Sequence, residues 1–181
     1  MINDNWSGLV VDSAKSNVDF IRQDDIHWRY DIKAVCSFIT RENVNRLIRE
    51  NIQEADIGLL VIDVDGNDYW IWKAIDAVRA RIVVCEYNGI FGCEHSVTVP
   101  YDENFVRARK HHSHLYWGAS LAALCLLAED KCYVFVGCNS NGNNAFFVRK
   151  DVCSLQHVDC KIGFVMPKFR ESRNREQKLD Y

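Results

Sequence analysis

The apolar run from Gly58 to Ile62 is the feature that most restricts the fold, because it has no polar interruption and stops at Asp63. A strand that is apolar at every position lacks the alternation of a half-exposed strand, and is typical of a parallel sheet buried on both faces. Parallel strands need crossover connections, which are usually helices. The run therefore predicts an α/β architecture.

Strand and helix patterns alternate along the rest of the chain. The expected strands lie at residues 8–12, 30–38, 58–62 and 81–86. The expected helices lie at residues 16–22, 40–52, 68–80 and 117–130. Turn residues at 139–143 separate two further strands, 132–138 and 144–149, and predict an antiparallel hairpin. We expect a doubly wound, mostly parallel sheet with this C-terminal hairpin, in a single domain over residues 1–160.

The composition is that of a folded protein and excludes several classes. The chain has 181 residues and a net charge of −3. Its C-terminal segment, residues 167–181, holds five basic and three acidic side chains, and this small excess of positive charge makes a nucleic-acid partner an unfavoured expectation. No apolar stretch reaches the roughly 18 residues of a membrane-spanning helix, and the first residues lack a secretory signal pattern. We therefore predict no membrane partner and a cytoplasmic location. Residues 161–181 are polar and predict a flexible tail.

Eight cysteines are present, and no two have the CxxC spacing. Five of them, including Cys36, Cys85 and Cys132, lie inside apolar runs, which predicts buried free thiols in a reducing compartment. His111, His112 and His114 cluster in the long polar connection after residue 86, but no matching ligand spacing accompanies them. The sequence therefore predicts no metal site.

Ligands of open parallel sheets bind outside the carboxyl ends of the strands, so the residues that follow each apolar run are the candidate site residues. They are Asp12, Ser37, Asp63, Asp65, Glu86 and Asn88. From position alone, Asp12 is explained equally well as a ribose ligand and as a helix cap or loop carboxylate.

The segment from Asp63 to Asp68 places three acids around Gly66. Such a group can bind a cation, orient a substrate hydroxyl or cap the next helix, but capping explains only Asp68. The glycine is at the fourth position, so this is not an EF-hand loop. We expect a site role for Asp63 or Asp65.

The same segment also resembles the phosphatase motif of the haloacid dehalogenase superfamily. In that motif the first Asp is the nucleophile and the second the acid/base, which would be Asp63 and Asp65. Asn67 replaces the usual Thr, and no later acidic Gly-Asp pair supplies the metal ligands. A phosphatase is therefore the weaker alternative.

Six segments together resemble FkbM-like proteins of the S-adenosylmethionine-dependent methyltransferase superfamily, over roughly residues 6 to 150. The segments are WSGLVVD (6–12), IDVDGNDYW (62–70), VCEYN (84–88), YWGASL (116–121), VGCN (136–139) and NNAFFVR (143–149). The resemblance implies a seven-stranded Rossmann-like sheet. It also implies methyl transfer from S-adenosylmethionine to a hydroxyl of a small molecule or sugar.

The resemblance further implies roles for the candidate residues. On the cofactor side, Asp12 would bind the ribose, Ser37 would lie beside the adenine and Asp63 would lie near the sulfonium. The catalytic residues on the acceptor side would be Asp65, Glu86 and Asn88. There a carboxylate could take the proton of the hydroxyl as its oxygen attacks the methyl group.

The family's first strand and glycine-rich loop have no counterpart before Gly8, so we expect a sheet truncated at its N-terminus. In the family that strand lies between the strands that end at Asp12 and Asp63. An empty position would leave unpaired backbone groups at about 1 to 3 kcal/mol each. We therefore keep a second hypothesis, a non-catalytic remnant of the fold that forms a homo-oligomer and completes its sheet with another chain.

Overall fold

The computed structural model describes residues 6–168 and 172–179, and its contacts group the chain into two compact units. Unit 1 comprises Met1–Ala55 with Ala74–Val78, and unit 2 comprises Asp56–Lys73 with Arg79–Tyr181. Compact units can belong to one domain, so a single domain over residues 1–160 stays a prediction.

Unit 1 is built around two parallel strands. Its elements are β1 (Gly8–Asp12), α1 (Lys15–Gln23), α2 (Asp25–Arg29), β2 (Ile32–Cys36) and α3 (Val44–Asn51). The strands pair in register from Gly8 with Ile32 to Asp12 with Cys36. Val18 of α1 and Leu47 of α3 are buried, as their helical spacing predicts.

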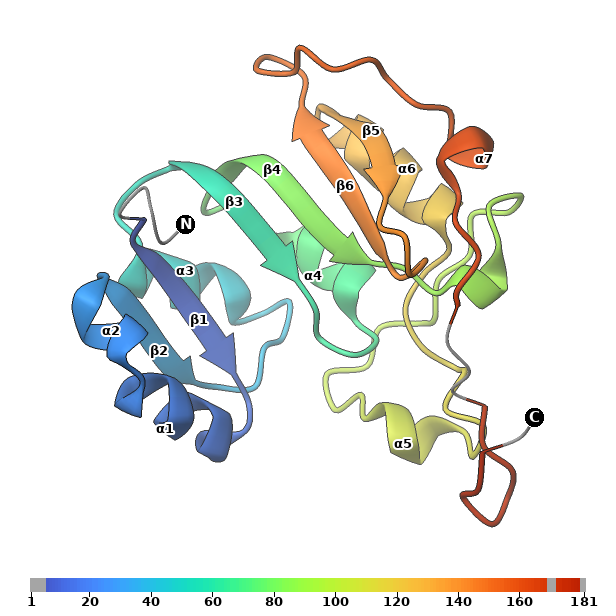
Figure 1. Ribbon diagram of the computed structural model, residues 1–181, viewed down its shortest axis with the longest axis horizontal. Helices are drawn as coiled ribbons and strands as arrows, with labels where there is room; N and C mark the ends of the chain where they lie inside the picture. Colours follow the sequence, from blue (N-terminus) through green and yellow to red (C-terminus); the bar gives the residue numbers. More distant parts are fainter. Residues whose placement is uncertain (1–5, 169–171, 180–181) are drawn as a thin grey trace. The chain divides into compact units, whose positions relative to one another are not determined.

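Unit 2 contains a four-stranded sheet in the order β3-β4-β6-β5 (Figure 1). The strands are β3 (Asp56–Ile62), β4 (Arg79–Glu86), β5 (Tyr133–Cys138) and β6 (Asn144–Arg149). The helices are α4 (Asp68–Ala74), η2 (Gly89–Phe91), α5 (Arg107–Lys110), α6 (Leu121–Asp130) and α7 (Cys160–Gly163). β3 and β4 are parallel, whereas β6 is antiparallel to both neighbours. The α/β class and the C-terminal hairpin are thus confirmed.

Helix α4 ends six residues before the boundary that its apolar pattern predicts. The cause is Asn45, whose side-chain Nδ2 donates to the Ala74 carbonyl at 2.8 Å. Its Oδ1 accepts from the amides of Asp76 and Ala77 at 2.9 and 3.0 Å. These bonds satisfy backbone groups that a longer helix would have paired internally, so the chain leaves the helix there.

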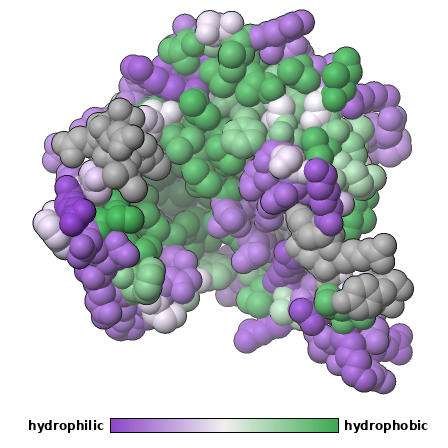
Figure 2. All heavy atoms as spheres, in the orientation of Figure 1, coloured by the Kyte–Doolittle hydropathy of each residue, from purple (hydrophilic) through white to green (hydrophobic). Residues whose placement is uncertain are grey.

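The two faces of the unit 2 sheet differ in burial. On one face Val83 and Phe147 are fully buried, and Trp72 of α4 packs its ring on Phe147 with centroids 4.8 Å apart. On the other face Val61 is 58% exposed and Ile82 is 40% exposed. Figure 2 shows hydrophobic atoms gathered on this second face, over the region where Figure 1 places β3, β4 and β6. Burial on both faces, predicted from the apolar run, is therefore wrong for Val61.

Part of the predicted tail packs against unit 2. The Tyr87 hydroxyl donates to the Val165 carbonyl at 2.6 Å, and the Lys168 amide donates to the Asn141 carbonyl at 3.1 Å. Residues 169–171 and 180–181 of the predicted flexible tail lie outside the described residues. None of the described helices combines the length and apolarity needed to cross a membrane.

All eight cysteines are free thiols among the described residues, as the sequence predicts. Their burial is less complete than expected, since Cys36 and Cys132 are exposed and only Cys85 is fully buried. Cys36 is the last residue of β2 and Cys132 precedes β5 with a φ of 65°, so both lie where a strand meets a turn.

Candidate functional site

The carboxyl ends of β3 and β4 bring three acidic side chains together. The strands are parallel, and Ile62 pairs with Cys85, so the residues after them lie side by side. Asp63, Asp65 and Glu86 each place a carboxylate oxygen within 4.8 Å of the others. We call these three residues the acidic cluster. Their position after the strands is the signal by which the sequence identifies them.

A buried acid shapes the loop that carries two of the cluster residues. Asp68 is fully buried, and its carboxylate accepts hydrogen bonds from the amides of Val64 and Gly66, both at 2.9 Å. Gly66 has a φ of 144°, a conformation that favours glycine. Asp68 therefore holds the preceding loop, a role that the expectation of a simple helix cap did not include.

Negative charge in the cluster is poorly compensated. Glu86 Oε2 is out of contact with solvent and has no hydrogen-bond partner among the described residues. Burial, and then the carboxylates of Asp68, Asp63 and Asp65, raise the pKa of Glu86 to about 8. Burial and the nearby Asp65 also raise the pKa of Asp63. Each additional negative charge therefore costs free energy here.

Arg107 is a basic side chain that acts on the cluster from the long connection after β4. It opposes the rise in the pKa of Glu86. Its guanidinium carbon lies 4.4 Å from the ring centroid of Trp117, and its Nε donates to the His114 carbonyl at 2.7 Å. Sequence reasoning missed Arg107, because nothing in the local pattern shows that this connection returns to the strand ends.

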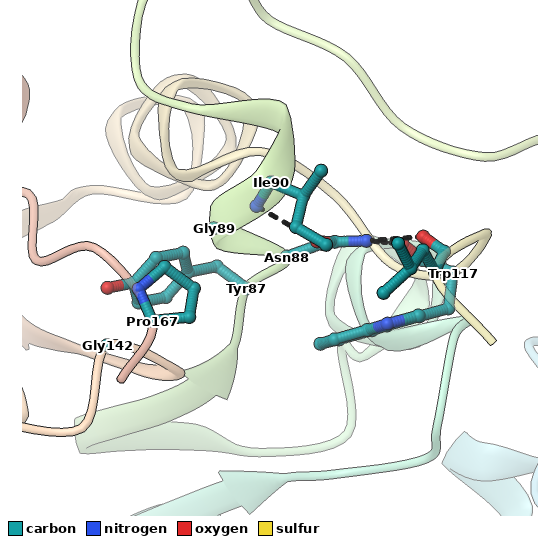
Figure 3. Close-up of a pocket in the computed structure, with 8 residues that line it drawn as sticks. Tyr87, Asn88, Gly89, Ile90, Trp117, Gly142 and Pro167 are labelled. Carbon is teal, nitrogen blue, oxygen red and sulfur yellow. Dashed lines mark hydrogen bonds between the residues drawn. The ribbon is translucent and has the colours of Figure 1, made fainter. Parts of the chain in front are cut away.

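Asn88 has its amide occupied by backbone partners (Figure 3). Its Nδ2 donates to the carbonyls of Leu115 and Trp117, both at 2.9 Å, and its Oδ1 accepts from the Ile90 amide at 3.1 Å. The cavity beside it is about 50 Å³, far below the roughly 300 Å³ at which ligand pockets begin. Asn88 thus positions the loop next to Glu86, and its catalytic role stays a prediction.

Asp12 and Ser37 lie together at the carboxyl end of the unit 1 sheet. The Ser37 amide donates to the Asp12 carbonyl at 3.0 Å, and the Ser37 hydroxyl donates to the Phe38 carbonyl at 3.3 Å. The Asp12 carboxylate accepts from the Asn17 side chain at 3.0 Å and from the Ala14 amide at 2.7 Å. These two bonds, the first with the larger effect, hold the pKa of Asp12 below its usual value. Asp12 is therefore an ionised acceptor at neutral pH.

Comparisons of the chain with protein-family models, with curated proteins and with solved structures found no match.

Proposed function

We propose that the chain is a methyltransferase-like protein of the Rossmann-like type, which uses S-adenosylmethionine to methylate a hydroxyl of a small molecule or sugar. The strand order carries the proposal. In the family that the sequence resembles, the strands ending at Asp12 and Asp63 flank a central strand. Among the described strands, β1 and β3 each pair with one neighbour, at the end of their own sheet, which is the arrangement expected of those flanking strands. Cytoplasmic location stays a prediction from the sequence.

Taken separately, each unit offers residues with the chemistry that the cofactor needs. Each Asp12 oxygen accepts one hydrogen bond, and a carboxylate oxygen can accept a second, so a ribose hydroxyl can be added. In unit 2, the negative potential around Asp63 favours a positively charged sulfonium. When bound, S-adenosylmethionine would supply an activated methyl group.

The acceptor side of the proposal relies on positioning. Asp65 and Glu86 can accept hydrogen bonds from a substrate hydroxyl and hold its oxygen in line with the methyl group. One of these carboxylates would take the hydroxyl proton as the O–C bond forms and S-adenosylhomocysteine leaves. The Asn88 amide fixes the backbone around Trp117 beside them. Few dedicated catalytic groups are needed, because orientation and exclusion of water supply much of the rate of such a transfer.

Calorimetric titration with S-adenosylmethionine and S-adenosylhomocysteine tests the cofactor proposal. We expect saturable binding that Asp12→Ala weakens by about 1 to 3 kcal/mol, because a hydrogen bond to a charged group is lost. Asp19→Ala, which removes another carboxylate of unit 1, should leave the affinity unchanged. A folded chain that binds neither compound, or an Asp12→Ala variant with unaltered affinity, contradicts the proposed contact.

The second candidate function is a non-catalytic module that assembles with a second copy of itself. The specific observation in its favour is the exposure of two large apolar side chains, Val61 and Ile82, on the same face of the unit 2 sheet. Sheets pack face to face at about 10 Å, so two copies could cover each other's apolar faces. This burial would provide the hydrophobic stabilisation that one copy lacks.

Mass measurement by light scattering tests the oligomer. If the module assembles through this face, Ile82→Glu should convert a dimer into a monomer, because a charge would be buried at the interface. Leu126→Glu is the matched control, since Leu126 is exposed on α6 instead. A wild-type chain that is already monomeric at micromolar concentration excludes this assembly.

A further inference from the structure

We propose that the acidic cluster binds one divalent cation of the class that prefers oxygen ligands, such as Mg²⁺, Mn²⁺ or Ca²⁺. Asp63, Asp65 and Glu86 offer three carboxylates whose ligand atoms lie within 4.8 Å of one another. Carboxylate oxygens are the usual protein ligands of these ions, and water molecules commonly complete the coordination. The sequence predicted no metal, because the resemblance assigned these acids to contacts with the cofactor and the acceptor.

The state of Glu86 is the second observation that points to a cation. Its Oε2 is buried and lacks a hydrogen-bond donor among the described residues. A buried acceptor without a protein donor is rare in folded proteins, and a bound ion is one of the partners that can satisfy such a group. Carboxylate oxygens of Asp63 and Asp65 lie within 4.8 Å of a Glu86 carboxylate oxygen, and negative charges this close repel one another. A cation would supply the missing partner and neutralise this repulsion.

The cluster is held in place before any ion arrives. Glu86 ends a strand that is paired on both sides, with β3 and with β6. Asp65 belongs to the loop that the buried Asp68 fixes through two backbone hydrogen bonds. Because Asp63 and Asp65 are exposed, an ion can enter from solvent and keep water ligands on that side. Supporting bonds of this kind raise metal affinity by fixing the ligand geometry.

Arg107 is a positive charge that would oppose a cation. It lies on the long connection after β4, whereas Asp63, Asp65 and Glu86 bring three carboxylates within 4.8 Å of one another. Its guanidinium is stacked on Trp117, and its Nε is bonded to the His114 carbonyl. The balance of charge at the cluster therefore stays negative.

Titration of the purified chain with Mn²⁺, followed by electron paramagnetic resonance of the free ion, tests this inference without cofactor or acceptor. We expect one saturable site from which Mg²⁺ or Ca²⁺ displaces Mn²⁺. Asp65→Asn and Glu86→Gln should each weaken Mn²⁺ binding at least about tenfold, because each replaces a carboxylate ligand with a neutral amide. Glu94→Gln should change nothing, since it removes an exposed carboxylate that is paired with Lys161. Circular dichroism shows which variants remain folded.

Two results would overturn the inference. One is the absence of saturable Mn²⁺ binding by the folded wild-type chain. The other is the same affinity in Asp65→Asn, Glu86→Gln and the Glu94→Gln control. This test is independent of the test of the proposed function. If the chain binds Mn²⁺ but not S-adenosylmethionine, the methyltransferase proposal is contradicted and the cation site is supported.

Discussion

Replacement of Trp72 by alanine is expected to lower the free energy of unfolding by about 3 to 5 kcal/mol. The Trp72 side chain is 2% exposed and packs its ring against Tyr133 and Phe147, with centroids 5.9 and 4.8 Å apart. It thereby attaches α4 to the buried face of the unit 2 sheet. Alanine would remove most of this contact area and leave a cavity that the paired strands cannot collapse to fill.

Denaturant unfolding followed by circular dichroism measures the effect. Trp28→Ala is the matched control, because Trp28 is 69% exposed and its replacement should change the free energy of unfolding by about 0.5 kcal/mol at most. Since α4 follows the loop of the acidic cluster, Trp72→Ala should also weaken Mn²⁺ binding. Equal losses of stability in the two variants would show that the Trp72 contacts are not part of a packed core.

The elements that the sequence predicted well are those fixed by local signals. The hairpin of β5 and β6 has its observed bounds within one residue of the predicted ones, because the Asn-rich segment between two apolar runs leaves the chain few other conformations. The three acids of the cluster were also identified, since the carboxyl ends of neighbouring parallel strands meet at one edge. Both predictions follow from where each apolar run ends and from the direction in which the chain runs through the strand.

The features that sequence reasoning missed depend on partners far along the chain. Asn45 ends α4 from a distant helix, although the apolar period continues beyond Ala74. The Asn88 side chain donates hydrogen bonds to the carbonyls of Leu115 and Trp117. The amide that was expected to contact a substrate is therefore already occupied. Arg107 reaches the cluster through a long connection without regular periodicity. Local propensity carries no information about such contacts, which appear only when the chain is folded.

Substitution of Gly66 by alanine is the second change with a large expected effect, because two costs combine there. The φ of 144° is strained for any residue with a Cβ. An added Cβ would also lie 2.2 Å from Cε1 of the buried Phe105 ring, much closer than non-bonded atoms approach. We expect a loss of about 1 to 3 kcal/mol from the backbone and a further loss of about 1 to 3 kcal/mol from the forced repacking.

Gly137→Ala separates the two costs. Gly137 has nearly the same φ, 143°, but an added Cβ there would meet no described atom within 4 Å apart from its chain neighbours. Gly137→Ala should therefore lower the free energy of unfolding only through the strained backbone. The excess loss in Gly66→Ala then measures the clash with Phe105.

In a double-mutant cycle with Phe105→Ala, the double variant should be more stable than the sum of the single effects predicts, because the added methyl group enters the space left by the ring. Because the displaced loop carries Asp65, Gly66→Ala should also weaken Mn²⁺ binding, whereas Gly137→Ala should not. Strictly additive losses in the cycle would contradict the close approach of the Phe105 ring to residue 66.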